Sequence, residues 1–216
     1  MMNGLGCGIY GYADAGRLVG THRSTVYGWF EHHRFRTSTS PHVSTGGVIS
    51  FLDLIEAKVV GKLRQMGVAM RMIRQAHGII SNELETEHPF SIRHIYSDGQ
   101  AIFLQAVEQI SIGKLVDVVR RQHFFPAILP FLRRVDYDDQ TLFAARWHIS
   151  EGVVLDPMRR FGKPIVEHCG LSTSVLAAAF RANDRDSDRV ADWYGIQPID
   201  VECAVGFERR IRRCAA

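Results

Sequence analysis

The sequence has few cysteines and no long uninterrupted apolar segment. Its 216 residues include four cysteines, which lie far apart and form no Cys-x-x-Cys pair. We therefore expect isolated reduced thiols in a cytoplasmic protein, rather than a disulfide framework or a metal site. No stretch of about 18 apolar residues is present, so no membrane-spanning helix is expected. The first residues also lack the basic and apolar regions of a signal peptide.

The motifs that accompany common enzyme chemistry are missing as well. The chain contains no Gly-x-Ser-x-Gly, no Gly-x-x-x-x-Gly-Lys-Ser/Thr and no His-Glu-x-x-His. His148, His168 and Cys169 could in principle supply a nucleophile and a base, but structural roles near strand ends are the favoured interpretation. Asp136, Asp138 and Asp139 are of the type that binds divalent cations, yet they lack the glycine and downstream glutamate of a calcium loop. We predict no catalytic residue, no bound metal and no cofactor.

Positive charge is concentrated in the first 80 residues. This segment carries nine lysines and arginines against four aspartates and glutamates, a net charge of about +5. Because the whole chain has a formal charge of +3, the remaining residues together carry about −2. A basic segment on a nearly neutral body is typical of a DNA-binding protein with a separate partner-binding part. A chance asymmetry of surface charge is the alternative.

The stretch from Tyr12 to Arg36 has the pattern of a helix-turn-helix. Two short helices, expected over residues 13–19 and 23–31, are separated by Gly20, and Thr21 or Ser24 is expected to cap the second. The apolar positions predict a small helical core of Ala13, Leu18, Val19, Val26, Trp29 and Phe30. The outward-facing positions carry groups that contact phosphates and base edges, and these are Arg17, Thr21, His22, Arg23, Ser24, Thr25, Tyr27 and Gly28.

A polar segment from His32 to Gly47 follows the second helix. A β-hairpin wing fits this segment, with Arg34 and Arg36 reaching the phosphate backbone of DNA. A disordered loop is the alternative. Beyond the segment, residues 49–78 have helical periodicity.

Local features mark the ends of the helices in residues 49–78. Ser50 can act as an N-cap with Asp53 as its acidic partner. A break is expected at Gly67, followed by a second helix over residues 68–76. Together, these segments resemble the MerR-type winged helix-turn-helix: the helix-turn-helix, the basic loop and the helices after it. In that family a short sequence motif follows the wing, and Leu63-Arg64-Gln65-Met66-Gly67 is similar to it. The metal-sensing cysteines and the long dimerising coiled coil of that family have no counterpart here.

Residues 81–149 mix helical and β-type patterns. A hairpin over residues 91–105 is predicted, because Asp98-Gly99 between alternating apolar runs favours a tight turn. A helix over residues 112–125 should end at Pro126, and a strand is expected over residues 142–149.

Residues 150–216 predict two short strands and three helices. The strands, over 153–155 and 164–167, precede a helix that Ser172 caps. A helix over 187–194 and a helix over 198–213 then meet at a glycine turn, which is the pattern of a second helix-turn-helix.

The C-terminal part also resembles a small bacterial domain long of unknown function. The matching positions include Asp156-Pro157, residues 162–166, residues 190–196 and Phe207-Glu208, whereas residues 168–171 replace the usual Gly-Thr. In its order of segments the whole chain resembles VapB-like antitoxins. That resemblance implies an antitoxin of a type II VapBC module, which binds operator DNA, autoregulates its operon and neutralises a PIN-domain ribonuclease toxin. It also implies that the arginines of the last helix contact the acidic toxin site, namely Arg209, Arg210, Arg212 and Arg213. A solvated helix end is the alternative for these four residues.

We therefore expect a mainly α protein with short β hairpins, an α+β fold. Residues 1–80 should form the winged helix-turn-helix, 81–149 an α/β middle segment, and 150–216 a trihelical domain with short strands for dimerisation or toxin binding. The expected partners are operator DNA, a VapC-like PIN-domain toxin and a second copy of the chain, with no membrane, in the cytoplasm at the nucleoid. A stand-alone MerR-like transcription regulator with an effector-binding middle domain is the alternative. It also stays open whether both helix-turn-helix parts contact DNA.

Overall fold

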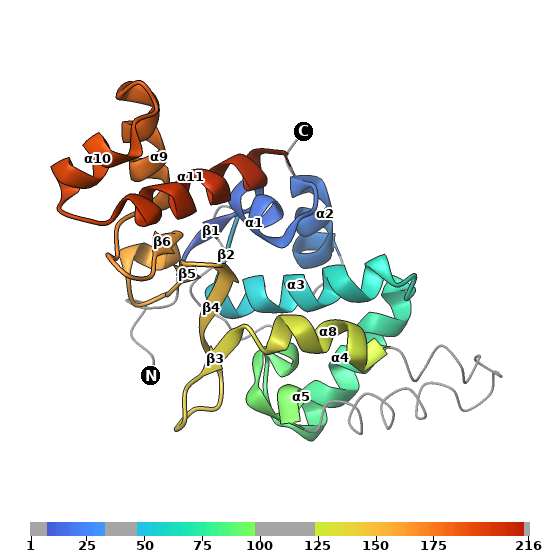
Figure 1. Ribbon diagram of the computed structural model, residues 1–216. Helices are drawn as coiled ribbons and strands as arrows, with labels where there is room; N and C mark the ends of the chain where they lie inside the picture. Colours follow the sequence, from blue (N-terminus) through green and yellow to red (C-terminus); the bar gives the residue numbers. More distant parts are fainter. Residues whose placement is uncertain (1–7, 33–46, 98–123, 214–216) are drawn as a thin grey trace.

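Helix α3, Phe51–Gln65, lies at the centre of the larger part of the fold, whereas the helices of residues 173–194 lie away from it (Figure 1). We describe the fold from a computed structural model that covers residues 8–32, 47–97 and 124–213. The predicted cap of α3 is confirmed, because Oγ of Ser50 accepts a hydrogen bond from the Asp53 N–H at 3.1 Å and Asp53 accepts one from the Ser50 N–H at 2.9 Å. Most residues between Phe51 and Val60 are buried. A helix that is buried nearly all round belongs in the middle of a fold.

The N-terminal part consists of short elements that pack on one side of α3. They are β1 (Tyr10–Gly11), α1 (Tyr12–Val19), α2 (Arg23–Tyr27), the π-helical turn η1 (Gly28–His32) and β2 (Val48–Ile49). Strands β1 and β2 pair antiparallel, with Tyr10 opposite Ile49, a pairing that the sequence did not predict. Ala13 is exposed, so its predicted place in the core is wrong; Ala15, on the inner face of α1, is fully buried instead. The predicted wing falls on residues 33–46, outside the described residues.

The segment after α3 confirms one helix and corrects a predicted strand. Helix α4 (Met70–Glu83) follows the predicted break at Gly67, whose φ is +82°. The short helices η2 (Pro89–Ser91) and α5 (Arg93–Ser97) come next. The first strand of the predicted hairpin is therefore wrong, and its turn at 98–99 lies outside the described residues. Of the described residues in that predicted strand, only Ile92, just before α5, has extended backbone, and it pairs with Phe143 in an isolated antiparallel bridge.

Helix α8, Phe124–Leu132, passes through the position where a helix was predicted to end. Pro126 lies within the described part of α8, so the predicted end of a helix at this residue is wrong. The earlier part of the predicted helix, residues 112–123, lies outside the described residues.

A four-stranded antiparallel sheet connects the middle of the chain to its C-terminal part. Its order is β3 (Val135–Tyr137), β4 (Ala144–Ser150), β5 (Val153–Leu155) and β6 (Ile165–Val166), and the 3-10 turn η3 (Arg160–Gly162) precedes β6. The strands predicted over 142–149, 153–155 and 164–167 are thus confirmed with small shifts. The sheet takes strands from both sides of residue 150.

Three helices follow the sheet, and the predicted bounds of the last two are confirmed. They are α9 (Thr173–Ala182), α10 (Ser187–Tyr194) and α11 (Pro198–Arg213), with Gly195 in the left-handed conformation between the last two. They enclose a small apolar cluster with β6, made by Val166, Leu176, Ala177, Val190, Ala191, Val201, Ala204 and Val205. Ser172 stands at the N-cap of α9, but its side chain makes no capping hydrogen bond.

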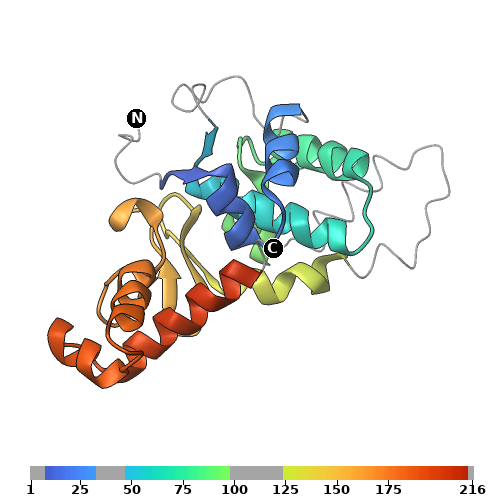
Figure 2. The same ribbon diagram turned by 90° about the horizontal axis from the view of Figure 1, so that it is seen from above.

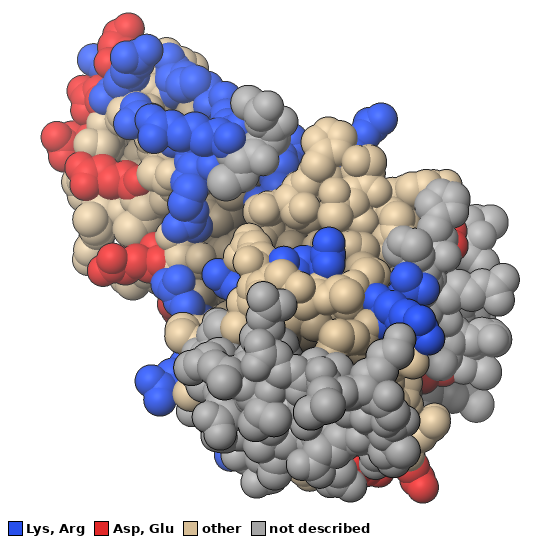
Figure 3. Space-filling view, turned by 90° about the vertical axis from the view of Figure 1, so that its right-hand side faces the viewer, with Lys and Arg blue, Asp and Glu red and all other residues tan. Residues whose placement is uncertain are grey.

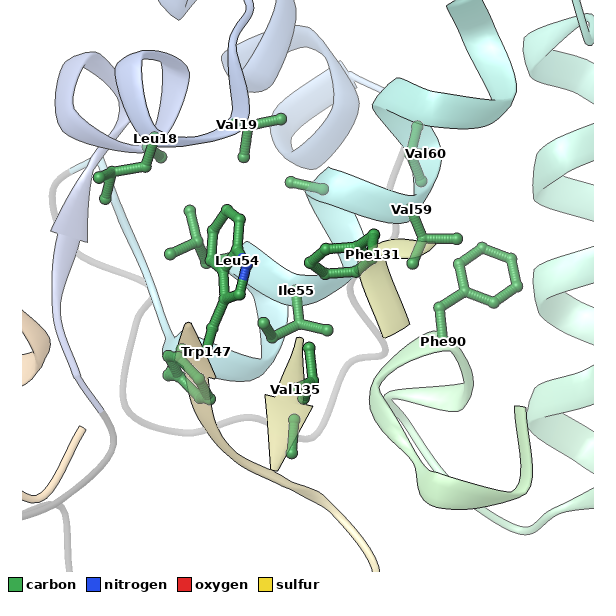
Figure 4. Packing of buried hydrophobic residues seen from close by; sticks show 14 of the residues in the cluster. Leu18, Val19, Leu54, Ile55, Val59, Val60, Phe90, Phe131, Val135 and Trp147 are labelled. Atoms are coloured by element: carbon green, nitrogen blue, oxygen red, sulfur yellow. The ribbon is translucent and has the colours of Figure 1, made fainter. Parts of the chain in front are cut away.

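The main core lies between α3 and the elements that cover it (Figure 4). Leu18 and Val19 of α1 reach it from one side, while Phe131 of α8 and Trp147 of β4 reach it from another. Phe207 of α11 is 2% exposed and belongs to this main core. Helix α11 therefore extends from the C-terminal helices to the side of α1, as Figure 2 shows. Among the described residues, no helix combines the length and the apolar character that crossing a membrane requires.

Candidate functional site

The turn between α1 and α2 is closed by backbone hydrogen bonds to one carbonyl. The N–H groups of Gly20 and Thr21 both donate to the Gly16 oxygen, at 2.9 and 2.8 Å. Gly20 has a φ of +83°, a conformation that glycine adopts without strain. Gly16 itself has no room for a side chain, because a Cβ there would lie 2.8 Å from the Thr21 oxygen. The predicted glycine turn at Gly20 is confirmed, and Gly16 is a second glycine that the turn requires.

Helix α2 is capped by neither of the two predicted residues. His22 is the N-cap, and its Nδ1 accepts a hydrogen bond from the Ser24 N–H at 3.3 Å and lies 2.7 Å from Oγ of Ser24. The predicted caps at Thr21 or Ser24 are therefore wrong. An imidazole nitrogen satisfies the same unpaired helix N–H that a short hydroxyl would satisfy.

The predicted second helix, residues 23–31, is divided into α2 and the π turn η1. The division keeps Val26, Trp29 and Phe30 buried on one side. Gly61 of α3 lies directly beneath them, since a Cβ there would be 3.4 Å from Val19 and 3.6 Å from Trp29. The helix-turn-helix is thus seated on α3 through a glycine contact.

None of the described residues predicted to contact DNA is fully buried. Of these, Arg17, His22, Arg23, Ser24 and Tyr27 are exposed, whereas Thr21, Thr25 and Gly28 are half-buried. The ring of Tyr27 packs edge-to-face on Tyr12, with centroids 5.5 Å apart. Arg17 forms an exposed ion pair with Asp14. Arg34 and Arg36 lie outside the described residues.

A groove of about 480 Å³ separates the helix-turn-helix from the end of α3. Thr21, Ser24, Thr25 and Gly28 line one wall, and Arg64 and Gln65 line the other. Arg64 donates a hydrogen bond to the Val68 oxygen at 2.7 Å, which holds its guanidinium at the end of α3. Arg64 and Gln65 were not among the predicted site residues. The signal in the sequence that could have found them is their polar type directly before the predicted break at Gly67.

The four C-terminal arginines do not form a uniform group. Arg210 donates hydrogen bonds to Oγ of Ser150 at 3.1 Å and to the Ile149 oxygen at 3.4 Å. Its guanidinium also lies 5.3 Å from the Phe207 ring centroid. Arg209, Arg212 and Arg213 are exposed and share a face of α11 by their helical spacing. Figure 3 shows many lysine and arginine side chains on the part of the surface that the C-terminal helices form.

The residues considered for catalysis are held apart by other contacts. Nε2 of His148 lies 2.8 Å from a carboxylate oxygen of Asp136, whereas Nδ1 of His168 lies 3.0 Å from Asp200. Burial raises the pKa of the Cys169 thiol, which is the opposite of what a nucleophilic cysteine needs. These histidines and this cysteine therefore have structural partners rather than each other.

The acidic residues 136–139 also have separate partners. Asp138 accepts hydrogen bonds from the N–H groups of Gln140 and Thr141, and these bonds lower the pKa of its carboxyl. Asp139 pairs with Arg93 at 3.1 Å. Within the described part of the chain, no three acidic, histidine or cysteine side chains gather as a metal site would require.

The comparisons with known proteins extend over nearly the whole chain. No model of a known protein family matches it. The chain is 24% identical over 223 residues to a Mycobacterium tuberculosis protein named "Putative antitoxin VapB45", and the match covers 91% of this chain and 92% of that protein. The crystal structure of Rv2018 from M. tuberculosis superposes with a TM-score of 0.74 at 22% identity, covering 91% of this chain and 96% of that one. The chain therefore shares its α+β fold with Rv2018.

Proposed function

We propose that this protein is a non-enzymatic antitoxin of a VapBC-like toxin-antitoxin module. The observation that carries the proposal is the match to an antitoxin-named protein over 91% of this chain. Two properties of the structure support it independently. A helix-turn-helix presents its polar face to solvent at one end, and three arginines of the last helix are exposed near it (Figure 2).

In this proposal the N-terminal unit binds the operator of its own operon and represses transcription. Helix α2 enters the major groove and brings Arg23, Ser24, Thr25, Tyr27 and Gly28 to the base edges. The adjoining positions, Arg17, Thr21, His22, Arg34 and Arg36, contact phosphates. Arg64 and Gln65, on the opposite wall of the groove, add a second line of contact beside α2.

The C-terminal helices bind the toxin in this proposal. The resemblance to VapB-like antitoxins implies a PIN-domain ribonuclease as the toxin, and such an enzyme has an acidic metal site. Arginine pairs with carboxylates through two parallel hydrogen bonds. All four arginines are exposed, but Arg210 is hydrogen-bonded to β4 of its own chain, which leaves Arg209, Arg212 and Arg213 for this contact. The predicted toxin contact is therefore narrowed to three of the four arginines.

A homodimer completes the proposed assembly, since operators are commonly two-fold symmetric. The C-terminal helices carry the apolar surface that such a contact needs, because Trp193 is 69% exposed and Ile199 is 54% exposed. The proposed place of action is the nucleoid in the cytoplasm. The division into domains 1–80, 81–149 and 150–216 stays a prediction, with the sheet β3–β6 bridging the last two.

Co-expression with the product of the adjacent gene tests the proposal. We expect co-purification with a small PIN-domain protein, loss of that protein's ribonuclease activity in the complex, and a shift to larger size on adding DNA from upstream of the operon. A stable complex without any loss of ribonuclease activity would contradict the antitoxin assignment.

The second candidate is a stand-alone MerR-like regulator with an effector-binding middle domain. The resemblance of residues 12–76 to the MerR-type unit favours it. In that case the purified chain binds operator DNA, no adjacent toxin is neutralised, and a small molecule changes the affinity for DNA.

A further inference from the structure

A second concave site lies between the helix-turn-helix and the C-terminal helix. It is a cavity of about 460 Å³, which we call the basic cavity, and α1, α3, α8, β4 and α11 all contribute to its walls. This volume lies in the range of small-molecule sites. Figure 3 shows the recess that separates the C-terminal helices from the rest of this face, with lysine and arginine side chains along its border.

Five cationic side chains from four different segments line the basic cavity. They are Arg17, Lys58, Lys62, Arg134 and Arg210, and no aspartate or glutamate of the described residues lines it. These cations are far apart in the sequence, so the fold alone brings them together. Their mutual repulsion is a cost that a bound anion would remove, and the cost is larger in a recess than on an open surface.

Three of the five cations are held in place by contacts with the protein. Lys58 donates a hydrogen bond to the Val19 oxygen at 2.8 Å, and its Nζ lies 5.7 Å from the Trp147 ring centroid. Arg210 is held by β4, and Arg17 is paired with Asp14 on the rim. A recognition site is effective when its charges are fixed before the ligand arrives.

The other two cations have no such contact. Among the described residues, the side chains of Lys62 and Arg134 form no hydrogen bond or ion pair. Lys62 lies one helical turn after Lys58 on α3, so both face the same side. Arg134 approaches from the end of α8. Three cations held by protein contacts, with two further cations beside them, are complementary in charge to a ligand that carries several linked negative groups.

The remaining wall is apolar. Phe131, Trp147 and Ile149 are buried residues that line it, and Leu18 closes it towards α1. The Phe131 and Trp147 rings pack edge-to-face with centroids 5.4 Å apart, which makes this wall rigid. An apolar wall beside a row of cations suits a ligand in which a phosphate chain is attached to a less polar group.

We propose that the basic cavity binds a small polyphosphate, either a nucleoside polyphosphate or a bare phosphate chain. Linked phosphates carry several charges in a short row and pair well with lysine and arginine. Gly20 lines both this cavity and the groove beside α2, so the ligand lies against the turn of the helix-turn-helix. The site is independent of the proposed antitoxin function, because it requires neither a toxin nor an operator.

The test compares two double variants with equal loss of charge. Lys62→Ala with Arg134→Ala removes the two cations without local bonds, and Arg71→Ala with Arg74→Ala removes two exposed cations of α4 that do not line the cavity. Binding of ATP, tripolyphosphate and inorganic phosphate to the full chain is measured by calorimetry, and circular dichroism checks that each variant is folded. If the first pair unfolds, Lys62→Gln and Arg134→Gln are measured singly.

We expect saturable binding of ATP or tripolyphosphate to the wild type. Each removed cavity cation should weaken it about tenfold, the value of one charge-assisted hydrogen bond, whereas the α4 pair should change it less than about twofold. If ATP binds more tightly than tripolyphosphate, the ligand is a nucleotide. If the two bind equally, the ligand is a bare phosphate chain. Three results would each overturn the proposal. The wild type shows no saturable binding of ATP or tripolyphosphate, or both double variants weaken that binding equally. The third is that the Lys62 and Arg134 substitutions weaken binding of duplex DNA and leave binding of ATP and tripolyphosphate unchanged.

Discussion

Glu56 and His77 form a buried pair that joins α3 to α4. Oε2 of Glu56 lies 2.9 Å from Nε2 of His77, and Oε1 of Glu56 accepts a hydrogen bond from the Phe90 N–H at 3.0 Å. The His77 ring also packs edge-to-face on Phe90, with centroids 5.1 Å apart. Glu56 is 1% exposed and His77 is 7% exposed. One carboxylate therefore fixes α4 and η2 against the helix on which the helix-turn-helix is seated.

The first prediction concerns this carboxylate. Glu56→Ala should lower the free energy of unfolding by about 2–4 kcal/mol, because it removes a buried carboxylate that accepts hydrogen bonds from two buried groups. Glu56→Gln keeps one acceptor and should cost less. Urea denaturation measures both, with the exposed Glu83→Ala of α4 as the control, which should change stability by less than about 0.5 kcal/mol. If Glu56→Ala is no more destabilising than Glu83→Ala, the buried pair does not stabilise the fold.

The second prediction concerns the closed turn at Gly16. Gly16→Ala should destabilise the protein by about 1–3 kcal/mol, since the new Cβ would overlap the Thr21 oxygen and force the turn to shift. Affinity for operator DNA should fall as well. Gly78→Ala is the matched control, because a Cβ on this helical glycine of α4 would meet nothing within 4 Å. This substitution should raise the free energy of unfolding by about 0.5–1 kcal/mol. Thermal unfolding and a DNA-binding assay distinguish the two; equal effects would show that the turn tolerates a side chain.

The third prediction concerns phosphate contacts on DNA. Arg23→Ala with Arg34→Ala should weaken operator binding and reduce the slope of log K against log salt by about 2, one unit for each lost phosphate contact. Arg93→Ala removes an exposed cation of α5 whose partner, Asp139, is also exposed, and it should leave the slope unchanged. Fluorescence anisotropy over a salt series gives both slopes. A wild-type slope in the double variant would rule out these contacts.

The fourth prediction concerns the toxin contact. Arg209→Ala, Arg212→Ala and Arg213→Ala together should abolish toxin neutralisation in a growth assay, because they remove the groups proposed to pair with the acidic site. Operator binding should be retained. Truncating the chain before residue 207 is a poorer experiment, since Phe207 belongs to the main core and its loss should cost about 3–5 kcal/mol.

Arg210→Ala is the matched control for the triple variant. It removes one cation from the same helix end, but this cation is bonded to Ser150 and Ile149. We expect neutralisation to persist with Arg210→Ala. The reverse pattern, loss with Arg210→Ala and retention with the triple variant, would move the toxin contact to the other face of α11.

Features that depend on neighbouring residues could be predicted from the sequence. The capping box of Ser50 and Asp53, the left-handed turn at Gly20 and the bounds of α10 and α11 were all predicted correctly. Each rests on a hydrogen bond or a backbone conformation within a few residues, so local chemistry is sufficient to specify it. The exposed polar face of α2 follows from the same periodicity. The sequence by itself thus determined most of the described helices and the glycine turn between α1 and α2.

Tertiary structure decided the features that join distant segments. Residues 93–97 form the helix α5, where alternation had indicated a strand, and Ile95 of this helix is buried. Bonding to β4 separated Arg210 from the other arginines of its helix. Lys58 and Arg134, which are far apart in the sequence, line the same cavity. No local sequence pattern specifies contacts between residues that are distant in the sequence. These contacts form when apolar faces of different elements pack together and bring the charged residues of those elements close to each other.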